Sequence, residues 1–290
     1  MPGRKKRLFG NKNGTWRTIG FFNVITGFLK LNMAENDNKH PNREKPEVVV
    51  VMPAYNAAQT LIKTYKDIPE GSCDAILLVD DASGDDTARI ARELNLEVIE
   101  HPTNLGYGAN QKTCYTHALA MGAEIVVMLH PDYQYDPRII PDLVKPIREG
   151  TADAVLASRM LGDPLGGGMP TYKYIFNKML TWIENKALGT NFSEFHTGYR
   201  AYGAHALRTV NYKADSNDFV FDNQIIVQCV DAGLKFKEIP VRTYYAEDSS
   251  SVGFMTSLRY GLGVLGVVAQ YMLHRLGVID SKLYKSSKSE

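Results

Sequence analysis

From Val48 onward, short apolar runs alternate with longer segments in which apolar residues recur at helical spacing. The short runs are rich in valine, isoleucine and leucine, as in strands that are buried on both faces of a sheet. Strands and helices that alternate in this way form βαβ units, so the pattern predicts an α/β fold with a mainly parallel, right-handed sheet. The predicted strands cover residues 48–52, 75–79, 97–100, 125–129 and 154–157, and the predicted helices cover 59–67, 87–94, 108–121 and 139–149.

The pattern loosens after about Gly162, where three consecutive glycines interrupt the chain at 166–168. Helical spacing returns over 172–188 and 220–232, followed by a strand-like run over 236–241. Residues 258–276 predict one amphipathic helix or two, with no charge between Arg259 and Arg275.

The first 31 residues differ from the rest, because they carry many basic residues and no acid precedes Glu35. Apolar residues recur at helical spacing between Phe21 and Leu29. Such a segment can lie on an anionic membrane surface, or it can be a solvated arm with a short helix docked on the domain. The sequence therefore divides into a basic amphipathic arm and linker (1–46), a main α/β domain (47–245) and a C-terminal amphipathic helical segment with a polar tail (246–290).

Net charge, cysteine content and hydropathy exclude several classes of protein. A net charge of +1 on 290 residues gives no reason to expect nucleic acid. Cys73, Cys114 and Cys229 are far apart and form no CxxC motif, so we expect free thiols rather than disulfides or a zinc site. The sequence contains no secretory signal pattern and no apolar span long enough to cross a bilayer. We therefore expect a cytoplasmic protein, with peripheral attachment to the inner face of the membrane left open by the basic arm.

Polar or turn residues follow four of the predicted strands: Pro53–Asn56, Asp80-Asp81, His101–Asn104 and His130–Asp132. Ligands of open α/β sheets bind beyond the carboxyl ends of the strands, so these clusters predict a binding site at that edge. The Asn104–Gly108 segment carries two glycines, but it does not follow the first strand and lacks the third glycine of a dinucleotide fingerprint.

With these motifs in this order, the chain resembles glycosyltransferase family 2, in particular the branch similar to dolichyl-phosphate mannosyltransferases. The resemblance covers roughly residues 47–245 and implies the GT-A fold, the fold of nucleotide-diphospho-sugar transferases. The matching segments are Val49–Asn56, Leu78–Thr87, Asn104–Gly108, Met128–Gln134, Ala157–Arg159 and Thr197–Arg200.

The resemblance also implies roles for single residues. Pro53 and Tyr55 would flank the nucleotide base, Asp80 would accept a hydrogen bond from the base ring, and Asp81 would support that turn. Capping of the local turn is the competing structural role for Asp81.

Further along the chain, Asp132 and Gln134 would sit at a Mg²⁺ or Mn²⁺ ion and at the donor diphosphate, because these ions prefer oxygen ligands. Arg159 would approach the diphosphate or the acceptor, and Arg200 is a second candidate for this task, with a structural ion pair as its alternative.

The sequence departs from the family pattern at the Asp-x-Asp motif, which here reads His130-Pro131-Asp132. His130 could ligate Mn²⁺, or a water could fill the position of the missing carboxylate. No strong base motif stands out, and the candidates are Asp218, Asp222 and Glu194.

The resemblance implies an inverting hexosyltransferase of cell-envelope glycan biosynthesis. It would move a sugar from a UDP- or GDP-sugar to a polyprenyl-phosphate or glycan acceptor. The histidine in the metal motif motivates one alternative, a catalytically silent protein that only binds nucleotide-sugars or serves as a scaffold. A sugar-1-phosphate nucleotidyltransferase is less compatible, because Pro53–Asn56 stands where that class places a glycine-rich basic loop.

Overall fold

The computed structural model describes residues 45–243 and 254–284. The predicted N-terminal arm and the segment 244–253 lie outside these ranges. A seven-stranded sheet has the order β3-β2-β1-β4-β6-β5-β7, and β6 runs antiparallel to both of its neighbours while the other pairings are parallel. The α/β class and the mainly parallel sheet are thereby confirmed. The strands are β1 (Val48–Ala54), β2 (Ala75–Asp80), β3 (Glu97–Glu100), β4 (Ile125–Met128), β5 (Ala154–Ser158), β6 (Arg200–Gly203) and β7 (Phe236–Pro240).

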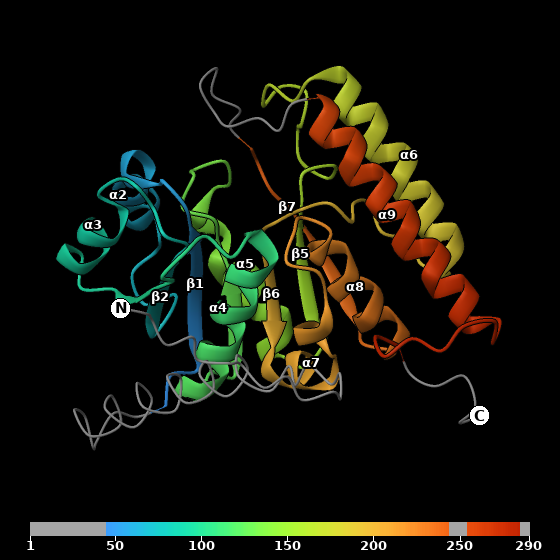
Figure 1. The fold of residues 1–290 in the computed structure, drawn as a ribbon. Coiled ribbons are helices and arrows are strands. Elements are labelled where there is room, and N and C mark those ends of the chain that lie inside the picture. Colours follow the sequence, from blue (N-terminus) through green and yellow to red (C-terminus); the bar gives the residue numbers. More distant parts are fainter. Residues whose placement is uncertain (1–44, 244–253, 285–290) are drawn as a thin grey trace, which may run out of the picture. The chain divides into compact units, whose positions relative to one another are not determined.

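Helices cover both faces of the sheet, which is why the central strands are apolar along their whole length (Figure 1). All seven residues of β1 are buried, and so are the four residues of β4. The helices are α2 (Ala58–Lys66), α3 (Thr87–Glu93), α4 (Tyr107–Met121), α5 (Ile140–Arg148), α6 (Thr171–Leu188), α7 (Ala204–Thr209), α8 (Phe221–Asp231) and α9 (Phe254–Arg275), with short 3₁₀ turns at Pro137–Ile139 and Tyr212–Ala214.

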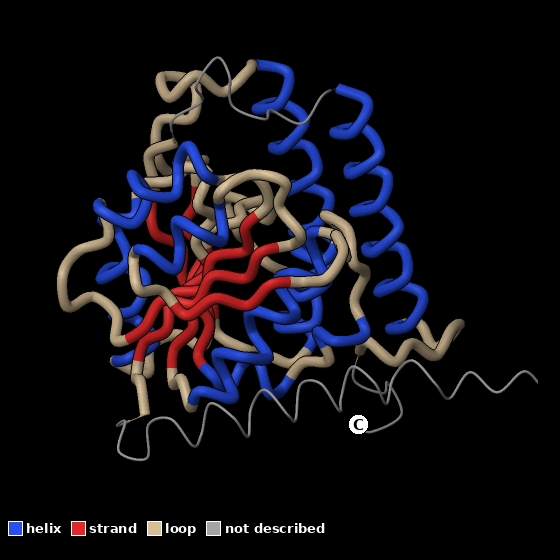
Figure 2. The backbone as a smooth tube through the Cα atoms, turned by 60° about the vertical axis from the view of Figure 1, so that its left-hand side comes forward, coloured by secondary structure: helices blue, strands red, loops and turns tan. Residues whose placement is uncertain are grey.

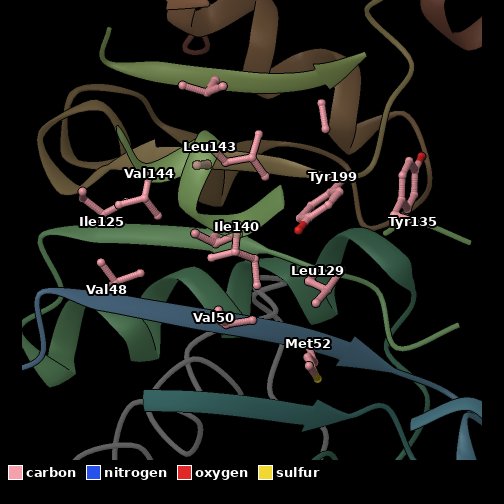
Figure 3. Packing of buried hydrophobic residues seen from close by; sticks show 14 of the residues in the cluster. Val48, Val50, Met52, Ile125, Leu129, Tyr135, Ile140, Leu143, Val144 and Tyr199 are labelled. Carbon is pink, nitrogen blue, oxygen red and sulfur yellow. The ribbon is translucent and has the colours of Figure 1, made fainter. Parts of the chain in front are cut away.

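Successive residues of β1 point to opposite faces of the sheet and so enter two separate cores. Val48, Val50 and Met52 join the core beneath α5, with its residues Ile140 and Leu143 (Figure 3). Residues 49 and 51 join the other core, which α4 and α8 cover. Because both sides are packed, β1 is fixed in register between β2 and β4.

Sequence patterns missed β6 and the short helix α7 that follows it. The strand has only four residues, and it begins with Arg200, a residue type that rarely enters a core. Its antiparallel direction places its first residue at the carboxyl end of β4, where Met128 pairs with Arg200. The segment before β6 therefore joins the same sheet edge as the loops that follow the parallel strands.

Residues 254–275 form one continuous helix, α9, rather than two. This helix lies beside α6 beyond the β5–β7 side of the sheet, and both pack against α8 (Figures 1 and 2). At their contact, a Cβ on Gly261 would meet the Phe176 ring at 2.5 Å, so the glycine permits the close approach of the two helices. None of the helices in the described ranges is both long and apolar enough to cross a membrane.

Candidate active site at the carboxyl edge of the sheet

The loops after β1 and β2 are joined directly to each other. The Asp81 amide donates to the Ala54 carbonyl at 2.9 Å, continuing the pairing of Ala54 with Asp80 in the sheet. Asn110 on α4, which the sequence did not reveal as a site residue, donates its side-chain amide to the carbonyls of Val79 (3.0 Å) and Ala54 (3.3 Å). The ends of β1 and β2 therefore lie together, as predicted, and Asn110 of α4 links them through these hydrogen bonds.

The segment Pro53–Asn56, which we expected to flank the nucleotide base, has one buried and one exposed part. Pro53 is buried within β1, whereas Tyr55 exposes 57% of its surface. Asn56 has a left-handed backbone, φ 52°, and its side-chain oxygen accepts from the Gly84 amide at 2.9 Å. Its own amide donates to the Ser83 hydroxyl at 2.8 Å. These bonds fix the loop beside an accessible aromatic ring, as stacking on a flat ligand would require.

The two aspartates that end β2 have different partners. Asp80 accepts from the amide (2.9 Å) and the hydroxyl (2.5 Å) of Ser83, and so shapes its own turn. A carboxylate has about four acceptor positions, which leaves Asp80 able to accept from a ligand as well. Asp81 accepts from the amides of Leu105 (2.8 Å) and Gly106 (3.0 Å) and from the His101 ring (2.7 Å). Its supporting role reaches across to the next loop.

That loop is pressed against the segment before α8. A Cβ on Gly106, which has φ +100°, would meet the Asn217 carbonyl at 2.6 Å, and one on Gly108 would meet the Ser216 carbonyl at 2.5 Å. Only glycine fits these two positions without moving a backbone. The close approach brings Tyr107, the first residue of α4, under the end of β4.

Tyr107 lies at the centre of a buried polar chain. Its ring stacks on His130 with 5.4 Å between centroids, and its hydroxyl contacts His130 Nε2 at 3.1 Å. The same hydroxyl donates to Asp222 at 2.7 Å. Asp222 also accepts from Gln111 Nε2 at 2.8 Å and pairs with Arg200 at 3.2 Å. Both carboxylate oxygens of Asp222 are thus engaged by neighbouring side chains.

The protonation of this chain follows from its contacts. Burial lowers the pKa of His130, an effect that Asp132 and Asp222 oppose and Arg200 reinforces, so the imidazole is neutral near pH 7. Burial and then Asp222 raise the pKa of Tyr107, which stays a phenol. The phenol gives its one proton to Asp222 and can only accept from His130, so Nε2 carries the imidazole proton. The lone pair of His130 then resides on Nδ1, which is the nitrogen able to bind an ion.

Asp132 lies on the exposed turn that follows β4, where it accepts from the Gln134 amide at 3.0 Å. The turn is fixed by Tyr133, whose backbone is left-handed at φ 59° and whose hydroxyl donates to Asp67 at the C-terminal end of α2. Lys63 covers the Tyr133 ring at 3.7 Å from its centroid. Asp132 is thereby presented to solvent from a fixed position.

Within residues 45–243 and 254–284, no group of three or more His, Cys, Asp or Glu side chains is arranged to hold a metal ion. The Asp132 carboxylate, which is exposed, and the Gln134 amide oxygen are nevertheless ligands of the type that Mg²⁺ and Mn²⁺ prefer, and they would join an ion that takes its other ligands from a diphosphate and from water. The residues fit a metal that arrives with the donor, rather than a preassembled metal centre.

Arg159 is held by Glu194, a carboxylate with no exposed surface. Glu194 accepts from the Arg159 amide at 2.7 Å and from its Nε at 2.8 Å, and also from Asn177 at 2.8 Å. Burial acts to raise the pKa of Glu194, but Arg159 and these donors outweigh it and hold the pKa below its usual value. Glu194, one of the candidate bases, is therefore engaged in fixing Arg159, whose Nη2 also donates to the His196 carbonyl at 2.7 Å.

The remaining two candidates differ in exposure. Arg200 is wholly buried and bonds to the carbonyls of Thr197 (2.7 Å) and Asp222 (3.0 Å), so it forms the structural ion pair considered as its alternative role. Asp218 accepts from the Val220 amide at 2.9 Å and so shapes the turn just before α8. Arg200 therefore has no exposed surface with which to reach a ligand, whereas Asp218 is exposed.

A comparison with protein-family models matches residues 49–210 to "Glycosyl transferase family 2", which is more than half of the chain. The matched region contains the loops after β1 and β2 and the turn that carries Asp132. The chain belongs to glycosyltransferase family 2. It is therefore a glycosyltransferase, as the resemblance implied.

Two relatives of this glycosyltransferase carry named activities. One is the UDP-N-acetylglucosamine–dolichyl-phosphate N-acetylglucosaminyltransferase of Methanococcus voltae, 25% identical over 71% of this chain and 89% of the relative. The other is the undecaprenyl-phosphate mannosyltransferase of Micrococcus luteus, 28% identical over 67% of this chain and 82% of the relative.

Among solved structures, glucosyl-3-phosphoglycerate synthase of Mycobacterium tuberculosis has the same fold. It was crystallised with Mn²⁺, UDP-glucose and phosphoglyceric acid. Its TM-score is 0.59 at 18% identity, over 86% of this chain and 85% of that chain. The GT-A fold of the glycosyltransferase is thereby confirmed.

Two further residues of the site were missed from sequence. These are Tyr107 and Gln111, which lie on α4 and support Asp222. Tyr107 lies inside the segment Asn104–Gly108, which matched the family pattern without a role for its ring, so a polar ring at a helix start was the available signal. Tyr107 and Gln111 lie more than 100 positions from Asp222 in the chain, and no local pattern identifies these contacts.

Proposed function

We propose that this glycosyltransferase moves a sugar from a UDP- or GDP-sugar to a polyprenyl phosphate, with inversion at the anomeric carbon. The single observation that carries the proposal is the meeting, at one sheet edge, of the Tyr55–Asp80 loops with the exposed Asp132 turn. The names of the two relatives reported above each contain a lipid phosphate, dolichyl phosphate in one and undecaprenyl phosphate in the other, which supports the acceptor class.

In the proposed reaction, an acceptor oxygen attacks the anomeric carbon and the bond from that carbon to the donor phosphate breaks. The nucleoside diphosphate leaves with the bonding electron pair. Pro53, Tyr55 and Asp80 hold the nucleoside, and Asp132 and Gln134, with His130 Nδ1, face the diphosphate. A bound Mg²⁺ or Mn²⁺ would neutralise the charge that builds up on the leaving diphosphate. Arg159 is the cation available to the diphosphate or to the acceptor.

The contacts of the acidic residues favour a phosphate acceptor over a sugar hydroxyl. A sugar hydroxyl must lose a proton and needs a base, whereas a polyprenyl phosphate is already ionised near neutral pH. Of the three candidate bases, Glu194 and Asp222 are paired with arginines and Asp218 caps a turn. A glycan acceptor would require one of these side chains to leave its partner.

Calorimetric titration of the full chain with UDP and with GDP, each with and without Mn²⁺, tests the donor site. We expect one nucleotide to bind and Mn²⁺ to tighten it. The Asp132→Asn variant should lose the effect of Mn²⁺ and retain metal-free binding, whereas Asp136→Asn, a nearby substitution away from the proposed ligands, should behave as wild type. An unchanged Mn²⁺ effect in Asp132→Asn would contradict the metal assignment, and no binding of either nucleotide would favour the silent, scaffold alternative.

Transfer is then tested directly by supplying the nucleotide-sugar that matches the bound base with a polyprenyl phosphate or with a glycan. Radiolabel appearing in the lipid fraction supports the proposal. Label appearing only in the glycan would assign the other acceptor class.

A further inference from the structure

Helix α6 has the reverse of the usual distribution of polar and apolar residues. Its buried positions include Asn177, Thr181 and Glu184, while its exposed positions include Ile175 (61% exposed) and Trp182 (62% exposed). A helix on the surface of a water-soluble domain normally buries its apolar stripe and exposes its polar one. The outward face of α6 is therefore suited to an apolar environment.

Helix α9 continues this apolar face. Exposed apolar residues recur along it at alternating spacings of three and four, which places them on one side of the helix. Met255 and Leu262 expose 72% and 62% of their surfaces, and Leu276 just beyond the helix exposes 73%. The exposed apolar residues of both helices, named here the α6–α9 face, are Tyr172, Ile175, Met179, Trp182, Met255, Leu258, Leu262, Leu265, Met272, Leu273 and Leu276.

The exposed charges on α6 and α9 have one sign, and one of them, Arg275, lies 3.7 Å from Asp231 of α8. Lys178, Lys186, Arg259 and Arg275 are exposed on the two helices. The only acid within either helix is Glu184, which has no exposed surface. Two copies of this face brought together would place cations against cations, whereas an anionic surface would be attracted to them.

The two helices are also connected to the candidate site. His196 lies between them, with Nδ1 at 3.0 Å from the hydroxyl of Tyr260 on α9 and Nε2 at 3.0 Å from Glu184 on α6. The His196 carbonyl in turn accepts from Arg159. The helix pair and Arg159 are thus both in contact with His196.

We propose that the α6–α9 face rests on an anionic lipid bilayer, with its apolar side chains among the acyl chains near the surface and its basic side chains at the headgroups. The inference rests on the proposed function for the lipid-phosphate acceptor, which this docking would place beside Arg159. Docking itself requires neither donor nor acceptor.

Trp182 offers a direct probe, because the chain has two tryptophans and the other, Trp16, can be replaced by phenylalanine. The full-length Trp16→Phe variant is mixed with vesicles of phosphatidylcholine, with and without phosphatidylglycerol. Insertion should shift Trp182 emission to shorter wavelength and make it quenchable by brominated acyl chains, on the anionic vesicles above all.

Three results would overturn the inference. Protein that sediments with anionic vesicles while Trp182 emission stays unchanged is held by another segment, such as the basic N-terminal residues. An emission shift that depends on protein concentration without vesicles, with a dimer in analytical ultracentrifugation, assigns the face to a second copy of the chain. The absence of vesicle binding would also refute it.

Substitutions on the face measure its contribution. Met179→Gln and Leu262→Gln alter exposed side chains, so folding should be retained, and each should weaken partitioning onto anionic vesicles by about tenfold. Ile62→Gln, an exposed apolar position on α2, is the matched control and should leave partitioning unchanged. Equal effects of all three substitutions would remove the face from the interaction. Because donor and acceptor are absent, the proposed sugar transfer can fail while docking stands, and the reverse.

Discussion

The pair of Glu194 and Arg159 can be tested by replacing Glu194 with glutamine, which keeps the size and removes the charge. The carboxylate is fully buried and accepts from the Arg159 amide, the Arg159 side chain and Asn177. In Glu194→Gln, the new side-chain NH₂ group faces the hydrogen-bond donors of Arg159 and Asn177, and the Arg159 guanidinium loses its negatively charged partner. Removing one partner of a buried ion pair costs about 3–5 kcal/mol.

We expect a loss near the lower end of that range, ~3 kcal/mol, because the Arg159 side chain keeps 15% exposure and water can solvate it. For a chain of this size the loss corresponds to a decrease in Tm of about 6–12 °C. Urea unfolding of the wild type and of Glu194→Gln, followed by circular dichroism, measures the difference. The Asp86→Asn variant, which breaks an exposed pair with Arg89, serves as the control and should show no measurable change.

A double-mutant cycle separates the pair from its surroundings. Arg159→Met combined with Glu194→Gln should recover part of the loss, since the unpaired cation is then gone. Because the pKa of Glu194 is lowered in the folded state, its contribution is complete above the unfolded pKa, about 4.3, and disappears as pH falls through the folded pKa. The stability gap between wild type and variant should therefore narrow in acid. A variant within 1 kcal/mol of wild type at pH 7 would refute the reasoning, on the scale of about 3–5 kcal/mol for buried pairs.

Three further predictions concern other parts of the chain. Gly108→Ala should lower the free energy of unfolding by about 1–3 kcal/mol, because its Cβ would meet the Ser216 carbonyl at 2.5 Å. The control is Gly266→Ala in α9, whose Cβ would have nothing within 4 Å and which should be neutral or stabilising. Equal effects of the two substitutions in chemical unfolding would argue against the contact. Burial raises the pKa of Asp215 to about 8, so the folded state holds a proton that the unfolded state releases above about pH 4. The stability of Asp215→Asn relative to wild type should therefore increase between these two pH values and stay constant above them. A stability difference that does not depend on pH would contradict this. Tyr107→Phe should destabilise the fold by about 1–3 kcal/mol by leaving an Asp222 oxygen without its donor, and thermal unfolding unchanged from wild type would exclude the buried chain described above.

The first half of the fold was predictable because its strands are buried on both faces. A run such as Val48–Met52 has no polar position that could turn it toward water, and the structure extends it only to Ala54. The helices between such strands begin and end close to their predicted limits, since each must return the chain to the same sheet edge.

The second half was less predictable because many of its polar residues are buried inside the fold. Arg200 enters a strand wholly buried, paired with Asp222 from α8, and no spacing in the sequence marks that contact. Glu184 on α6 was equally hidden, since a helix with an inward polar face resembles an ordinary amphipathic helix until its neighbours are known. The strand-end positions Asp80 and Asp132 were identified from sequence, whereas the partners that orient Arg159 were found only in the structure; the ligand-binding roles remain predictions.

Because β6 is antiparallel to its neighbours, insertions before and after this strand would lie at opposite edges of the sheet. In β1, β2 and β4 the segment after the strand reaches the site, but in β6 the segment before it does so, and a Cβ on Gly198 would meet His130 Nε2 at 2.8 Å. The turn that follows α7, near Val210, belongs to the opposite edge of the sheet. A fluorescent tag or an affinity loop inserted there would leave the catalytic edge unobstructed, whereas the same insertion before β6 would displace His130.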